Sequence, residues 1–209
     1  GAETVLGVTI ALIINRKFRG RQLVQSLFLL PVIATPVAIA LVWRFMFQPD
    51  LGILNKLLAV VGLPPSIWVA NSAWALPLVA LVDVWQWTGF IVLMTLTALI
   101  ALPKWPYEAA AVDGASSWQV LIHITLPMIR PVVIAAVIFR TIDALKTFDL
   151  IMVITGGGPG SASETIDLYA YRVTFEYQQL GYASAMLIAF FIMITLVSAY
   201  LARLRQSSK

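Results

Sequence analysis

The stretch Trp74–Leu102 reads WALPLVALVDVWQWTGFIVLMTLTALIAL, and Asp83 is its only charged residue. A helix of about 20 predominantly apolar residues is long enough to cross the roughly 30 Å hydrocarbon core of a bilayer. A run of this length and composition therefore predicts a helix that spans a membrane.

The composition of the whole chain points to the same class. Hydrophobic residues make up 60% of the 209 residues and charged residues only 11%, against roughly 45–50% and 25% in soluble domains. Such a chain cannot cover itself with a water-facing surface, which argues against a soluble enzyme. The absence of Cys and the presence of one His, His123, argue against a disulfide framework, a thiol nucleophile and a metal site.

The apolar runs predict an all-α, multi-pass membrane protein with about five spans in a single transmembrane domain, residues 1–209. The expected spans are residues 1–15, 23–47, 74–102, 131–155 and 182–203. The first is too short to cross and begins without Met, so we interpret it as the end of a truncated helix. A further short amphipathic helix is expected over Leu51–Gly62, at the outer interface.

Basic residues are concentrated in alternate connections. Nine basic residues lie on one side, in the first connection, at the ends of the connection over residues 104–130 and after the last span. The connections on the other side contain two. The nine are Arg16, Lys17, Arg19, Arg21, Lys104, Arg130, Arg203, Arg205 and Lys209, and the two are Lys56 and Arg172. The positive-inside rule places the nine in the cytoplasm and predicts a cytoplasmic C-terminus. The net charge of +4 therefore indicates membrane lipid as the partner and not nucleic acid.

The cytoplasmic connection over residues 104–130 is predicted to form a helix–turn–helix. Its helix boundaries are expected at residues typical of helix starts and ends: Pro106, Glu108 and Gly114 for the first helix, and Ser116 or Ser117 and then Pro127 for the second. The three alanines Ala109–Ala111 leave the first helix a thin surface that another protein can approach closely.

The spacing of seven residues in this connection resembles the signature of ABC importer permeases. The signature is Glu-Ala-Ala, three residues, Gly, nine residues, Ile, one residue and Leu-Pro, and the chain matches it throughout. The matching residues are Glu108, Ala109, Ala110, Gly114, Ile124, Leu126 and Pro127, and Asp113 stands beside them. Arg44–Phe47 with Gly52, and Gly157–Pro159, resemble the carbohydrate-uptake subgroup of these permeases.

The resemblance implies a core of six helices, of which this chain carries the last five and lacks the N-terminal one. It implies a second permease subunit, two cytoplasmic ATPases docked on the motif, and an extracytoplasmic binding protein that delivers a sugar-like solute. ATP would be bound by the ATPases. The chain itself would therefore need no cofactor and would not be an enzyme, and it would lie in the cell inner membrane.

Two helix faces carry polar and aromatic residues at positions i, i+3, i+4 and i+7: Asp83, Gln86, Trp87 and Phe90 in one span, and Arg140, Asp143, Ala144 and Thr147 in the next, with Asp143 near the midpoint. Polar groups pair with sugar hydroxyls and rings pack on the pyranose, so these residues suit a sugar. The resemblance implies that both faces line the translocation path. The alternative is that the charges only neutralise each other between helices.

The alternative function is an ion-coupled secondary carrier in which Asp83 and Asp143 titrate. We find no convincing internal repeat of the kind typical of such carriers, and a carrier would not need the Glu-Ala-Ala motif. The glycine-rich run Gly156–Gly160 lacks the Lys and Ser/Thr of a phosphate-binding loop, which predicts an external loop. The sequence leaves the solute open among a sugar, a polyol and a charged derivative such as a glycerophosphodiester.

Overall fold

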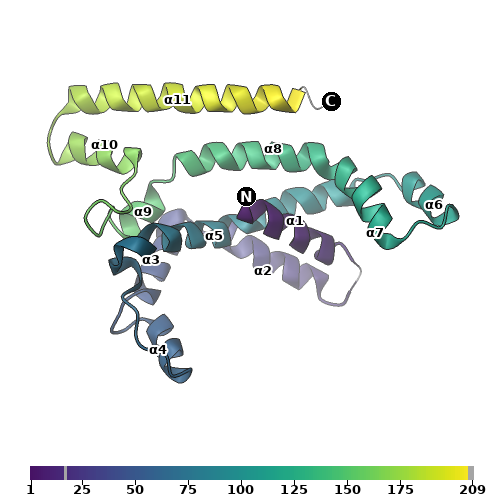
Figure 1. Ribbon diagram of the computed structural model, residues 1–209, viewed down its shortest axis with the longest axis horizontal. Coiled ribbons are helices and arrows are strands. Elements are labelled where there is room, and N and C mark those ends of the chain that lie inside the picture. The colour runs from purple at the N-terminus through teal and green to yellow at the C-terminus, as the bar shows by residue number, and fades with distance from the viewer. Residues whose placement is uncertain (17, 207–209) are drawn as a thin grey trace. The chain divides into compact units, whose positions relative to one another are not determined.

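The computed structural model describes residues 1–16 and 18–206, with side chains up to Arg203, and all regular elements among them are helices (Figure 1). This confirms the all-α prediction. The elements are α1 (Ala2–Ile14), α2 (Arg21–Ile33), α3 (Pro36–Met46), α4 (Ile53–Val60), a 3₁₀ turn (Trp68–Ala70), α5 (Ser72–Ile100), α6 (Trp105–Val112), α7 (Ser117–Val120), a π-helical turn (Leu121–Thr125), α8 (Leu126–Leu145), α9 (Asp149–Ile154), α10 (Ile166–Phe175) and α11 (Leu180–Gln206).

Three helical stretches of the described chain are long and apolar enough to cross a membrane. They are Ser72–Ile100, which is α5; Ser117–Leu145, in which α7, the π-helical turn and α8 are continuous; and Leu180–Arg203 in α11. The helices α2 and α3 pass the same test only together, as a bent pair. The helices at residues 74–102 and 182–203 thus agree closely with the sequence-based expectation.

The span expected over residues 23–47 consists of two helices, α2 and α3, because the helix is interrupted between them. Thr35 is extended, with φ −64° and ψ 139°, and Pro36 opens α3. The ring of a proline disfavours the helical conformation in the residue before it, so Thr35 is pushed into the extended region. Pro36 then suits the first position of the next helix, where its missing N–H costs no bond.

The predicted helix over residues 131–155 is wrong at both ends. It begins at Ser117, because Pro127 does not end the helix: a π-helical turn comes immediately before it, and the amide of Leu126 bonds to the carbonyl of Leu121. Such a wider turn is a recognised way for a helix to accommodate a local disruption. At the other end the helix stops at Leu145, and α9 follows as a separate short helix.

Contacts divide the chain into two units. Of the described residues, unit 1 comprises 1–16, 18–32, 87–141 and 201–206. Its core joins α1, the second half of α5 and the start of α8 through Ala11, Ile14, Val92, Leu96, Leu99 and Ile129. Helix α2 lies so close to α5 that a Cβ on Gly89 would be 2.0 Å from the carbonyl oxygen of Phe28. Small residues at a helix crossing permit such close approach of two backbones.

Unit 2 comprises residues 33–86 and 142–200, and in it α3 packs against α9. Arg44 donates through Nη1 to the carbonyl of Val153 at 3.2 Å. The predicted amphipathic helix is α4, and its buried Asn55 fixes it to the following loop. The Asn55 Oδ1 accepts from the amide of Ser66 at 3.0 Å and from the indole Nε1 of Trp68 at 2.8 Å.

The close crossing at Gly89 predicts that Gly89→Ala destabilises the protein. The added methyl meets a backbone atom that cannot rotate away, and overpacking of this kind costs about 1–3 kcal/mol. Gly181→Ala is the matched control, because Gly181 lies in α11 with open space around its Cα. Thermal unfolding in detergent should show a lower midpoint for Gly89→Ala only. Equal midpoints for the two variants would contradict the observed crossing.

Candidate functional site

Helix α6 carries the Glu-Ala-Ala residues and ends in a Schellman turn at Gly114. Gly114 has φ +69°, the amide of Ala115 donates to the carbonyl of Ala110 at 2.9 Å, and the amide of Gly114 reaches the carbonyl of Ala111 at 3.3 Å. These are the two bonds that define the motif, with a left-handed residue just past the helix. The left-handed prediction for Gly114 is confirmed, and the spacing from Ala110 to Gly114 has a geometric reason.

The next helix begins at once with a capping box. The hydroxyl of Ser116 accepts from the amide of Gln119 at 3.3 Å, and the amide of Ser116 donates to Oε1 of Gln119 at 2.8 Å. The reciprocal bonds satisfy two amides that a helix start leaves without partners. Of the two serines considered as caps, Ser116 is therefore the one that acts. We call residues Trp105–Pro127 the motif hairpin.

The outer surface of the motif hairpin is apolar in places where a loop is normally polar. Trp105 is 71% exposed, Val112 89% and Trp118 68%. Exposed apolar side chains that gather on one element mark interaction sites. The motif residues divide into an exposed set, Glu108, Ala109, Asp113, Gly114, Leu126 and Pro127, and a covered set, Ala110 and Ile124. His123 is exposed and its Nδ1 lies 3.1 Å from the carbonyl of Gln119.

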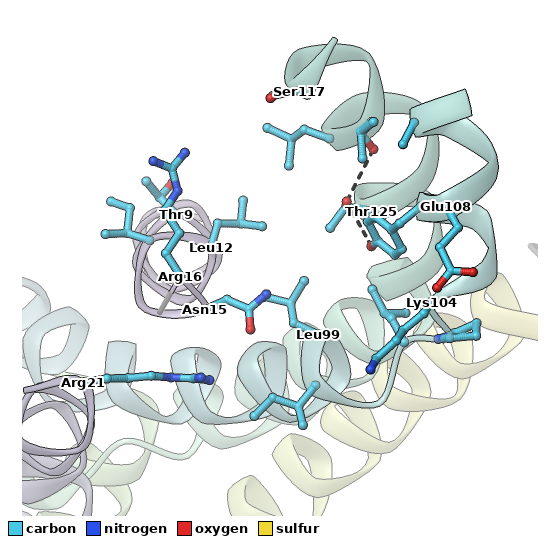
Figure 2. Close-up of a pocket in the computed structure, with 18 residues that line it drawn as sticks. Thr9, Leu12, Asn15, Arg16, Arg21, Leu99, Lys104, Glu108, Ser117 and Thr125 are labelled. Carbon is cyan, nitrogen blue, oxygen red and sulfur yellow. Dashed lines mark hydrogen bonds between the residues drawn. The ribbon is translucent and has the colours of Figure 1, made fainter. Parts of the chain in front are cut away.

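A cavity of about 920 Å³ lies in unit 1, between the ends of α1 and α5 and the motif hairpin (Figure 2). Its polar lining includes Arg16, Arg21, Lys104 and Glu108. Figure 2 shows these side chains around a space that opens between the helix ends. Three cations against one carboxylate give the cavity a positive character.

Three of the predicted path residues are brought together in unit 1. The guanidinium carbon of Arg140 lies 4.9 Å from the ring centroid of Trp87, and the ring of Phe90 lies 6.2 Å from that of Trp87. Arg140 also donates from Nε to Oε2 of Glu3 at 2.9 Å, and the two side chains are 6% and 13% exposed. Arg140 is thus a buried, ion-paired residue.

The sequence analysis does not identify Glu3 as a partner of Arg140. It considers charge pairing of Arg140 with Asp83 and Asp143 only. A signal was present, because Glu3 is the only charged residue of α1. A carboxylate in an apolar helix requires a partner, and an arginine in another apolar helix is the natural candidate. Sequence distance hid the pair, since the two residues are 137 positions apart.

The structure corrects the predicted placement of Asp143 and Thr147, which the sequence analysis put on one helix face with Arg140 and Ala144. Asp143 lies two residues before the end of α8 and not near a midpoint, and Thr147 lies beyond the helix, so Thr147 does not share its face. The amides of Lys146 and Thr147 bond to the carbonyls three residues earlier, at 3.0 and 3.3 Å, which closes the last turn. Ala144 is exposed. In the first set, Asp83 is partly buried and Gln86 is 1% exposed.

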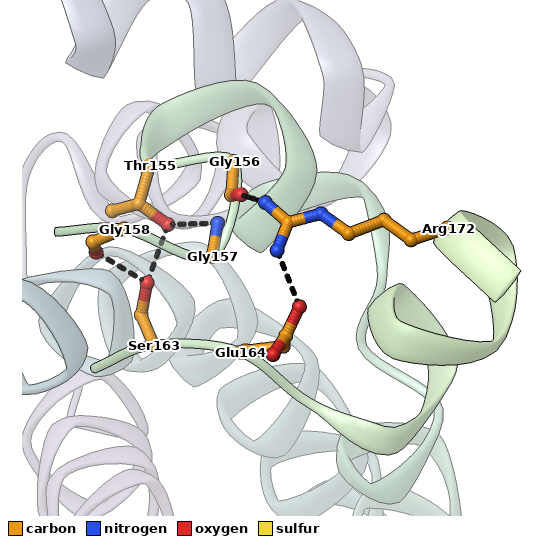
Figure 3. A network of polar contacts seen from close by, with 7 residues as sticks. All are labelled: Thr155, Gly156, Gly157, Gly158, Ser163, Glu164 and Arg172. Atoms are coloured by element: carbon orange, nitrogen blue, oxygen red, sulfur yellow. Dashed lines mark hydrogen bonds and ion pairs between the residues drawn. The ribbon is translucent and has the colours of Figure 1, made fainter. Parts of the chain in front are cut away.

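The glycine-rich loop after α9 is held by its own side chains (Figure 3). The hydroxyl of Ser163 lies 2.7 Å from that of Thr155 and 2.8 Å from the carbonyl of Gly158. Arg172 donates to the carboxylate of Glu164 and to the carbonyl of Gly156. These contacts close the loop on itself.

Residues 3–208 match the family of binding-protein-dependent transport system inner membrane components. The chain belongs to this family. It is 38% identical over 207 residues to the trehalose/maltose transport system permease protein MalF of Thermococcus litoralis, covering 98% of this chain and 70% of that protein. It is 36% identical over 200 residues to the sulfoquinovosyl glycerol transport system permease protein SmoG of Agrobacterium fabrum, covering 95% and 65%.

Among solved structures, the chain is similar to one in a bacterial alginate ABC transporter in complex with an alginate pentasaccharide-bound periplasmic protein. The TM-score is 0.89 at 25% identity, with 99% of this chain and 73% of that chain covered. The resemblance to carbohydrate-uptake ABC permeases is therefore confirmed, and these relatives give no support to a secondary carrier. The family match and the long apolar helices together show that the chain is a multi-pass membrane protein.

The buried pair predicts that Glu3→Gln destabilises the protein, because it removes the carboxylate to which the Arg140 guanidinium donates. Removing one partner of a buried ion pair costs about 3–5 kcal/mol. Thermal unfolding in detergent should therefore show a lower midpoint for Glu3→Gln than for the wild type. Glu176→Gln, at an exposed carboxylate, is the control and should match the wild type. A Glu3→Gln protein as stable as the wild type would refute the pair.

Proposed function

We propose that this chain is a translocation subunit of an ATP-driven, binding-protein-dependent importer that moves a sugar or related solute into the cytoplasm. The family and the sugar-transport names of the relatives support this assignment. The chain spans 70% and 65% of these two relatives, so the partners of the whole assembly are part of the proposal. They are a second permease subunit, two cytoplasmic ATPases and an extracytoplasmic binding protein.

The observation that carries the proposal is the motif hairpin. Its two helices are joined by a turn in which Gly114 and Ser116 fix the backbone, and it presents Trp105, Val112 and Trp118 to its surroundings. A rigid hairpin with exposed apolar side chains suits a groove on another protein. The acidic Glu108 and Asp113 are exposed beside them and would select a groove with basic groups. The groove would belong to an ATPase, which would bind the ATP.

The solute path would use the ring pair and the carboxylates on α5 and α8. In unit 1, Trp87 and Phe90 provide aromatic faces against which a pyranose can pack. Arg140 would act there as a positioning residue, because its guanidinium is ion-paired with Glu3. Asp83 and Asp143 would pair with hydroxyl groups of the solute. Because alternating access requires two walls that move against each other, the second permease would provide the other wall.

The proposal predicts that the chain neither hydrolyses ATP nor transports by itself. Liposomes that contain the purified chain, with ATP inside and labelled trehalose or maltose outside, should show no uptake. Uptake should appear when the partner permease, both ATPases and the loaded binding protein are present, and it should survive a proton ionophore. Uptake by the lone chain without ATP, abolished by the ionophore, would contradict the importer and favour the ion-coupled carrier.

A further inference from the structure

One contact within the motif hairpin joins residues outside the seven signature positions. The phenolic oxygen of Tyr107 lies 3.1 Å from Oγ1 of Thr125, drawn as a dashed line at Thr125 in Figure 2. Tyr107 is in α6, directly before Glu108, and Thr125 ends the π-helical turn, between Ile124 and Leu126. The contact therefore connects the two halves of the signature across the hairpin.

The hydroxyl of Thr125 has a defined role in this contact. Thr125 is 8% exposed, and its hydroxyl donates to the carbonyl of Val120 at 3.4 Å. A hydroxyl has one proton and two acceptor positions. With its proton directed at Val120, Thr125 accepts a hydrogen bond from Tyr107, so both hydroxyl groups are satisfied in a covered position.

Because of the position of Thr125, the hydrogen bond from Tyr107 restrains α6 relative to the start of α8. Besides this contact, α6 is joined to the following helix through the turn around Gly114, where a change in backbone angles would rotate α6. The π-helical turn is a second weak point, because its wider hydrogen bonds replace regular helical ones. Tyr107 reaches across both points and ties α6 to the residue that precedes α8.

We propose that Tyr107 is a positioning residue for energy coupling in the importer, acting through its hydroxyl on Thr125. The bond makes α6 and the start of α8 move as one body. A displacement of α6 by the ATPase is then transmitted to α8, and is not absorbed by rotation at Gly114 or by stretching of the π-helical turn. This inference rests on the proposed function, because it assigns a role within the same assembly.

The test measures the number of ATP molecules hydrolysed per solute imported by the complete transporter in proteoliposomes. Tyr107→Phe removes only the hydroxyl and should raise this ratio by about threefold or more, the rough effect of one lost hydrogen bond. Thr125→Val should do the same, whereas Thr125→Ser, which keeps the hydroxyl, should retain the wild-type ratio. The double variant Tyr107→Phe with Thr125→Val should be no worse than either single variant, because one bond is lost in each case.

Tyr182→Phe, at an exposed tyrosine in α11, is the matched control and should leave the ratio unchanged. Thermal stability and ATPase association are measured for the same preparations. An unchanged ratio for Tyr107→Phe, with wild-type import intact, would overturn the coupling role. A loss of import that only follows lower stability or weaker association would overturn it as well. Absence of ATP-dependent import in the wild type would instead overturn the proposed function, and this inference with it.

Discussion

The rest of the structure depends on backbone hydrogen bonding, because apolar surroundings offer no water to replace a lost bond. Helices satisfy this requirement within themselves, and three long apolar stretches of the described residues are helical throughout. Each interruption of a helix is therefore accompanied by a defined local backbone conformation. Thr35 is extended where Pro36 prevents the helix, a π-helical turn precedes Pro127, and a Schellman turn closes α6 at Gly114.

The motif hairpin is the place where this constraint becomes functional. The glycine, the capping serine and the Tyr107–Thr125 contact each remove a way in which α6 could rotate. A surface loop is normally mobile, but a loop that transmits force must be stiff. In the proposed importer, the exposed apolar side chains would provide the contact with the ATPase, and the internal bonds would carry the displacement to α8.

Local chemistry made much of this predictable from the sequence. The helices at residues 74–102 and 182–203 follow from apolar runs, and the left-handed Gly114 follows from the residue type and the motif spacing. The helix across Pro127 was not predictable in this way, because a proline usually ends a helix and the compensating π-helical turn has no simple sequence signal.

The candidate path was predicted less well, because it depends on contacts between distant segments. Periodicity could place Arg140 and Asp143 on one face, but it could not show that Glu3 pairs with Arg140 or that α8 stops at Leu145. Both facts depend on tertiary packing. The roles of Asp83 and Asp143 toward a solute remain predictions, whereas the position of Arg140 beside Trp87 is a feature of the structure.

The most direct test of this account compares Gly114→Asn with Gly114→Val in the affinity of the permease for the proposed ATPase partner. Gly114 has open space around its Cα, so a side chain there meets no atom and only the positive φ matters. Asn tolerates this conformation and a β-branched residue does not. The account predicts near-wild-type binding for Gly114→Asn and at least tenfold weaker binding for Gly114→Val, about 1.4 kcal/mol. Equal binding by the two variants would contradict it.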